Sequence, residues 1–175
     1  MSGRTPVPQG VTMGGHELDV IDRLLHLTPG DARWQLRRER PEFVEGANAC
    51  RDSVLTPQDD QGISPALRQA LALRMARLIG NAAQIENYQA GLADEYAPLA
   101  AGEGVAPEGS LLAAVVAHCD NVTLAPAQAQ EADIRRLEQA GLNAGQIVAL
   151  AELIAFVNFE SRVVTGLQAL ENWHE

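Results

Sequence analysis

The 175-residue sequence contains no lysine, and all 13 of its basic residues are arginines. A Schiff-base lysine, a pyridoxal phosphate anchor and the lysine of a phosphate-binding P-loop are therefore excluded. The acidic residues leave a formal net charge of −10 and a pI of about 4.8. A chain with this charge repels phosphates and anionic lipid headgroups, so neither nucleic acid nor a membrane is expected as a partner.

Aromatic residues make up only 4% of the chain, whereas hydrophobic residues reach 46%. A core of alanine and leucine side chains is typical of packed helices and predicts an all-α fold. The two cysteines, Cys50 and Cys119, form no CxxC pair and no metal-ligand spacing, and a secreted disulfide framework would need more. No apolar leader or membrane-spanning run stands out. We expect a cytoplasmic protein that needs neither a metal nor another cofactor.

The sequence divides into an arm and one domain. Residues 1–15 are rich in Gly, Pro, Thr and Ser and are predicted to be disordered, and residues 16–175 form one helical domain. Capping signals predict where its main helices begin, and these are Pro41, Ser64 with Pro65, and Asn143 with Gln146 before a long last helix at 144–170.

Shorter elements are predicted from helix-breaking residues and from the periodicity of apolar residues. Gly80 and Asn81 mark a sharp joint, and the expected helices beyond it span 82–96, 111–122 and 126–141. In the helix that Pro41 opens, Cys50 shares the apolar spacing and is expected in the core. The last helix is apolar around most of its circumference, which predicts a place at the centre of the fold or of an oligomer.

Three stretches resemble one protein family. They are RPEFVEGANACRDSVL at 40–55, ALRMARLIGNAAQIENY at 72–88 and AGLNAGQIVALAELIAFVNFESRVVTGLQAL at 140–170. Together they are similar to the carboxymuconolactone decarboxylase domain proteins of the alkylhydroperoxidase D and peroxidase-related group. The resemblance covers residues 17–170. It implies an alkylhydroperoxidase D-like helical bundle that assembles into homo-trimers or hexamers.

Active members of that family carry a Glu. Twelve positions after it comes the first Cys of the pattern Cys-x-x-Cys-x-x-x-His. A helix N-terminus stabilises the first thiolate, and the second Cys resolves the sulfenic acid that peroxide forms. The resemblance sets Gln69, Asn81, Gln84 and Tyr88 at these four places. None of them is a thiol, so the resemblance implies a member without the catalytic cysteine pair.

Three functions follow from these observations. The first is a binding or assembly subunit that works with a CxxC-bearing relative, since the family commonly pairs such proteins. The second is a non-redox enzyme of the carboxymuconolactone decarboxylase type that acts on a small carboxylate or lactone by positioning and proton transfer. The third is a weak thiol peroxidase that uses Cys119, although the end of a helix does not stabilise a thiolate.

The second function requires an anion-binding group and an acid or base in one pocket. Arg162 belongs to a polar stripe on the last helix and has no acid three or four positions away. We expect it to be buried and to pair with another helix or a ligand, with Glu86 as its candidate partner; a purely structural ion pair is the alternative. The candidate pocket comprises Glu86, Asn87, Tyr88, His118, Asn158 and Arg162.

Overall fold

The computed structural model describes residues 12–13, 16–17, 19–103 and 106–172. Helices account for nearly all of the regular structure in these ranges, which confirms the all-α prediction. Two short strands, β1 (Thr12–Met13) and β2 (His16–Glu17), pair antiparallel ahead of the first helix. The arm was expected at residues 1–15, and apart from β1 its residues lie outside the described ranges. Within the described ranges, no helix is both long and apolar enough to cross a bilayer.

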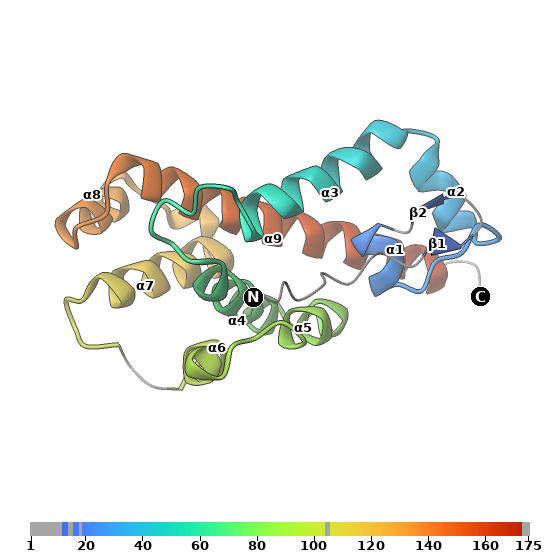
Figure 1. The fold of residues 1–175 in the computed structure, drawn as a ribbon. Helices are drawn as coiled ribbons and strands as arrows, with labels where there is room; N and C mark the ends of the chain where they lie inside the picture. Colours follow the sequence, from blue (N-terminus) through green and yellow to red (C-terminus); the bar gives the residue numbers. More distant parts are fainter. Residues whose placement is uncertain (1–11, 14–15, 18, 104–105, 173–175) are drawn as a thin grey trace, which may run out of the picture.

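The last helix, α9 (Ala144–Asn172), runs the length of the molecule (Figure 1). It begins at the predicted capping box, where the Asn143 side chain accepts a hydrogen bond from the Gln146 amide and the Gln146 side chain accepts one from the Asn143 amide. Six other helices pack on α9, and they are α1, α2, α3, α4, α7 and α8. The last helix is therefore central to the fold, as predicted, in that six helices pack on it, while residues along one of its faces stay exposed.

The helices α3 (Pro41–Leu55) and α4 (Pro65–Ile79) begin where the sequence predicts. Proline occupies the first turn of each, and the Ser64 side chain accepts a hydrogen bond from the Leu67 amide at the start of α4. Gly80 ends α4 with a φ of 80°, a left-handed conformation that glycine adopts without steric cost. The chain then turns sharply into α5 (Ala82–Gln89), as expected for this joint.

Two predicted helices prove to be shorter and interrupted. The segment expected to be helical over 82–96 ends at Gln89, and a 3₁₀ turn (Asp94–Tyr96) and α6 (Ala97–Ala101) follow. The break lies at Gly91, where an added Cβ would come within 2.9 Å of the Gln69 side chain. The segment expected over 126–141 is a 3₁₀ turn (Pro126–Gln128) followed by α8 (Glu131–Gln139), because Gln130 and Asp133 form a capping box one turn later.

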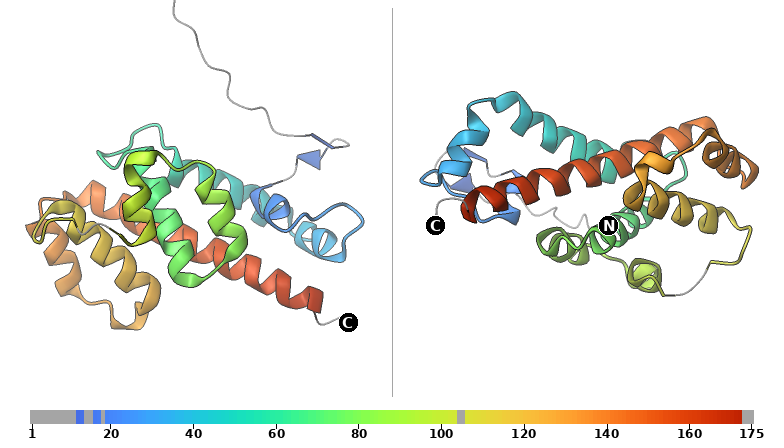
Figure 2. Two further views of the ribbon diagram at one scale, coloured as in Figure 1. Left: turned by 90° about the horizontal axis from the view of Figure 1, so that it is seen from below. Right: turned by 180° about the vertical axis from the view of Figure 1, so that it is seen from behind.

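Two hydrophobic clusters lie along α9. The larger one is formed mainly by α4, α7 (Leu111–Leu124) and the first half of α9. The smaller one joins the far end of α9 to α1 (Val20–Leu24) and α2 (Ala32–Arg38). Seen from below, α1 and α2 lie at one end of the molecule and α7 and α8 at the other (Figure 2, left). The joint between α4 and α5 contacts the middle of α9 through the side chains of Asn81 and Gln84.

Candidate functional site

The α4–α5 joint holds the positions that the family resemblance assigns to redox chemistry. Asn81 is the N-cap of α5, and its side-chain oxygen accepts a hydrogen bond from the Gln84 amide at 3.1 Å. The Asn81 side chain stabilises the helix start because it accepts a hydrogen bond from a free backbone N–H group. A thiolate at this position would be stabilised by the same N–H groups. Its Nδ2 lies 3.4 Å from the hydroxyl of Ser161 on α9.

A buried carboxylate on α9 connects the joint to the rest of the protein. Glu160 is 0% exposed and accepts hydrogen bonds from three side chains. Tyr88 donates to Oε2 at 2.6 Å, Gln84 donates to the same oxygen at 2.8 Å, and Arg51 donates to Oε1 at 2.9 Å. These four residues, which we call the Glu160 network, bring α3, α5 and α9 together. The donors satisfy a charge that burial alone would make unfavourable.

Arg51 is the part of the Glu160 network closest to solvent. Its side chain is 16% exposed, whereas those of Gln84 and Tyr88 are completely buried. The guanidinium also lies 5.2 Å from the centre of the Tyr88 ring, within range of a cation–π contact. Burial, with a further contribution from Glu160, raises the pKa of the Tyr88 hydroxyl far above its usual value. Tyr88 therefore remains a proton donor to Glu160 at any physiological pH.

The fourth motif position, Gln69, lies apart from the Glu160 carboxylate. Its side chain donates to the backbone carbonyl of Tyr88 at 2.6 Å and lies against Gly91. It thus closes the C-terminal end of α5, where carbonyl groups lack intrahelical partners. The four motif positions consequently serve the joint as a hydrogen-bonded structural unit.

The expectation that Arg162 is buried is wrong. Arg162 is exposed on α9, and so is Glu86 on α5. Among the described residues neither forms an ion pair. The two sequence positions between Glu160 and Arg162 rotate their side chains about 200° apart around the helix, so α9 turns Glu160 inward and Arg162 outward.

The other candidate pocket residues are spread over different parts of the fold. His118 on α7 is half-buried, and burial lowers its pKa while Asp133 on α8 opposes the shift. Asn158 donates to the Ile154 carbonyl at 3.0 Å and lies 3.5 Å from the Thr123 hydroxyl. Asn87 lines a separate surface hollow that also contains Glu86. Of the six candidates, only Tyr88 lies in the Glu160 network.

The two cysteines occupy opposite environments. Cys119 is completely buried, and burial raises the pKa of its thiol strongly. Cys50 was expected in the core but is exposed. The buried side of α3 includes Ala47 and Val54, with Arg51 reaching Glu160 between them, and Cys50 is turned about 100° away from Arg51. Within the described ranges, no cluster of three or more His, Cys, Asp or Glu residues could hold a metal ion.

Glu160 and Arg51 are the site residues that sequence reasoning missed. A helical-phase signal for Glu160 exists, because Leu153, Val157 and Val164 lie at positions −7, −3 and +4 from it and are all buried. An acid within an apolar face requires a hydrogen-bond donor from another element. On this ground Arg162 was expected to be buried and paired, whereas the same requirement was not applied to Glu160. No local pattern marks Arg51 as that donor, since 109 positions separate the pair.

Comparison with known proteins adds no relative. No family model, no curated protein and no solved structure matches the chain. The family resemblance therefore depends on the three quoted stretches alone.

Proposed function

We propose that this protein is a carboxymuconolactone decarboxylase and alkylhydroperoxidase D-type member that acts by binding or assembly and performs no thiol redox chemistry. One observation carries the proposal. The resemblance sets Asn81, Gln84 and Tyr88 at the places of the family's two cysteines and histidine, and all three side chains are buried and hydrogen-bonded within the protein. A peroxidatic centre needs a thiolate that peroxide can reach and a second thiol beside it.

The cysteines present do not replace the missing pair. Peroxide reduction requires the thiolate, and burial holds Cys119 in the thiol form. Cys50 is exposed on α3, but partial burial of its thiol and the nearby Glu152 carboxylate raise the pKa of that thiol as well. These environments speak against the third function, a weak peroxidase that uses Cys119.

The experiment that tests this proposal measures organic peroxide reduction in the presence of a dithiol reductant. We expect the purified protein to turn over no faster than a heat-killed sample. Turnover that persists in Cys50→Ser and disappears in Cys119→Ser would overturn the proposal. The assembly role is tested by native mass spectrometry of the protein mixed with a purified CxxC-bearing relative from the same cytoplasm. A stoichiometric complex is expected, and separate species at micromolar concentration would count against that role.

A non-redox enzyme acting on a small carboxylate or lactone is the second candidate. It is favoured by the Arg51–Glu160–Tyr88 arrangement, which unites a cation, a carboxylate and a phenol. Small carboxylates should then raise the melting temperature of the wild type by mass action. The paired variant Arg51→Met/Glu160→Gln should lose that rise. A wild type whose melting temperature does not respond to any carboxylate would remove this candidate.

A further inference from the structure

One face of α9 remains uncovered along most of its length. Seen from behind, α9 crosses the front of the molecule (Figure 2, right). Six exposed residues follow one another on this face at intervals of four, three, four, three and four positions, and they are Val148, Glu152, Ala155, Phe159, Arg162 and Gly166. Such alternation is the spacing by which one helix packs along another, and we call these six residues the α9 seam.

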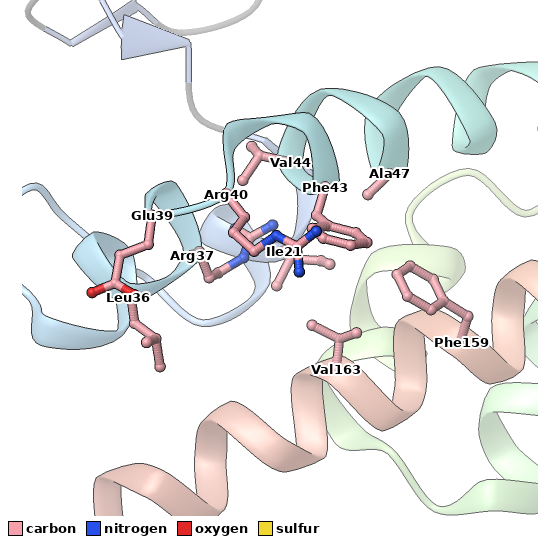
Figure 3. Close-up of a pocket in the computed structure, with 10 residues that line it drawn as sticks. All are labelled: Ile21, Leu36, Arg37, Glu39, Arg40, Phe43, Val44, Ala47, Phe159 and Val163. Carbon is pink, nitrogen blue, oxygen red and sulfur yellow. The ribbon is translucent and has the colours of Figure 1, made fainter.

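Four of the six α9 seam residues are apolar or small, although they stand at exposed positions where helices are usually polar. Phe159 is 43% exposed and Val148 is 56% exposed. The apolar surface continues from Phe159 into a groove between α3 and α9, where Phe43 approaches it from α3 (Figure 3). Cys50 and Ala155 line a second hollow beside the same phenylalanine. An exposed apolar surface of this continuity is typical of an interface.

We propose that a second copy of this chain packs on the α9 seam, with the two α9 helices antiparallel across a two-fold axis near Val157. In that register, residues whose numbers are symmetric about 157 face each other. Glu152 then faces Arg162 of the second copy, and the two-fold axis repeats the contact. Neither residue forms an ion pair within the described part of its own protomer.

The charges select the antiparallel arrangement. Glu152 and Arg162 are ten positions apart, about 15 Å along the helix. Parallel α9 helices in register would oppose Glu152 to Glu152 and Arg162 to Arg162, which is repulsive at both places. Only the antiparallel arrangement converts the two like-charge contacts into two opposite-charge contacts.

Side-chain sizes fit the same register. Phe159 faces Ala155 of the second copy, and Val148 faces Gly166 of the second copy. Each large side chain therefore meets a small one, which lets both helices approach closely. In a parallel in-register pair, Phe159 would meet Phe159, while Ala155 and Gly166 would leave gaps. Charge and size thus favour one arrangement independently.

This two-fold contact does not depend on whether the protein performs thiol chemistry. A finding of peroxidase activity would therefore overturn the proposed function without contradicting the dimer. It also bears on the expected assembly. A hexamer built from three such dimers contains the contact, whereas a ring of three copies around a three-fold axis alone does not.

Charge reversal tests the register directly. Glu152→Arg places two arginines on each seam, and Arg162→Glu places two acids on each seam. Each variant alone should raise the dimer Kd at least about tenfold, measured by sedimentation equilibrium. Mixed one to one, they should form a heterodimer, because each arginine then faces an acid. The double variant Glu152→Arg/Arg162→Glu should dimerise like the wild type.

Arg135→Glu on α8 is the matched control, because Arg135 is exposed and lies off the seam; it should leave the Kd unchanged. Circular dichroism establishes that each variant is folded. A wild type that is monomeric at 50 µM, on the order of the concentration at which weak dimers persist, would overturn the proposal. So would a wild-type dimer whose two single variants fail to form a heterodimer when mixed.

Discussion

At the scale of single residues, Glu160 is the group whose loss should disturb the protein most. Removing one partner of a buried ion pair leaves the other charged and unpaired, which costs about 3–5 kcal/mol. Glu160→Ala would leave Arg51, Gln84 and Tyr88 without their common acceptor. We expect a loss of that size in the free energy of unfolding by urea. Tyr88→Phe removes one hydrogen bond to a charged group and should cost about 1.5–3 kcal/mol.

Arg162→Met is the matched comparison on the same helix. Arg162 is exposed, so its loss from the monomer should change the free energy of unfolding by less than about 0.5 kcal/mol. The measurement is made at dilutions where no dimer is present. A large loss in Arg162→Met together with a small one in Glu160→Ala would reverse the assignment of the two residues.

The cysteines give a second prediction at this scale. Iodoacetamide reacts with thiolates, and burial raises the pKa of Cys119 while closing it to reagent. Native protein at pH 8 should therefore be alkylated at the exposed Cys50 and react at Cys119 only after unfolding. Because the Cys50 pKa is also raised, its alkylation should accelerate as the pH increases beyond 8. Peptide mass spectrometry distinguishes the two sites, and rapid native labelling of Cys119 would contradict its burial.

At the scale of elements, Arg68 fixes the connection between α3 and α4. It is 2% exposed and donates to three backbone carbonyls, those of Ile63 at 2.7 Å, Val54 at 2.9 Å and Asp60 at 2.9 Å. Burial lowers its pKa. Arg68→Met would remove the donor from the Ile63 and Val54 carbonyls, at about 1–3 kcal/mol each where no water replaces the bond, while the Asp60 carbonyl would keep the Ile63 amide as a donor. We expect a loss of several kcal/mol and faster proteolysis within residues 56–64.

Arg77→Met on the same helix serves as the control for Arg68. Arg77 is exposed and bonds only the exposed side chain of Gln89. Its replacement should change stability by less than about 0.5 kcal/mol and leave the proteolysis rate unchanged. Equal losses in the two variants would mean that Arg68 contributes through its position on the helix and not through its carbonyl contacts.

Elements also separate what the sequence could predict from what it could not. Helix starts at Pro41, Ser64 and Asn143 depend on contacts within a few positions, so their residues could be recognised directly. The end of α5 at Gln89 includes a contact from another helix, because the Gln69 side chain on α4 donates to the Tyr88 carbonyl, and 82–96 was predicted as one helix without it. The Glu160 network joins three helices, and the pairing of Arg51 with Glu160 depends on how these pack rather than on spacing. Local chemistry was thus predictable, and the partners of buried charges were not.

At the scale of the whole molecule, two cores of unequal size share α9. The larger contains α4 and α7, whereas the smaller joins α1, α2 and the last turns of α9. Buried ion pairs adjoin the smaller one, where Arg37 bonds both Asp19 and Asp22 and Arg38 bonds Asp22. Ion pairs offset their own desolvation and add little net stability. The buried apolar area therefore decides which end of the molecule is more stable.

We therefore expect the end formed by α1 and α2 to open before the rest, as a separate unit. Hydrogen exchange followed by mass spectrometry in low urea should show amides in Val20–Leu24 and Ala32–Arg38 opening at a lower free energy than amides in α4. Trp34 is buried in the smaller core, and Trp34→Ala should lower the opening free energy of that unit by about 3–5 kcal/mol while leaving α4 unchanged. Leu71→Ala in the larger core is the reciprocal variant. It should lower protection in α4 by about 2–5 kcal/mol and change α1 and α2 only where global unfolding already limits them. If Trp34→Ala lowered protection in α4 as much as in α1 and α2, the molecule would unfold as one cooperative unit, and α9 would transmit stability along its whole length.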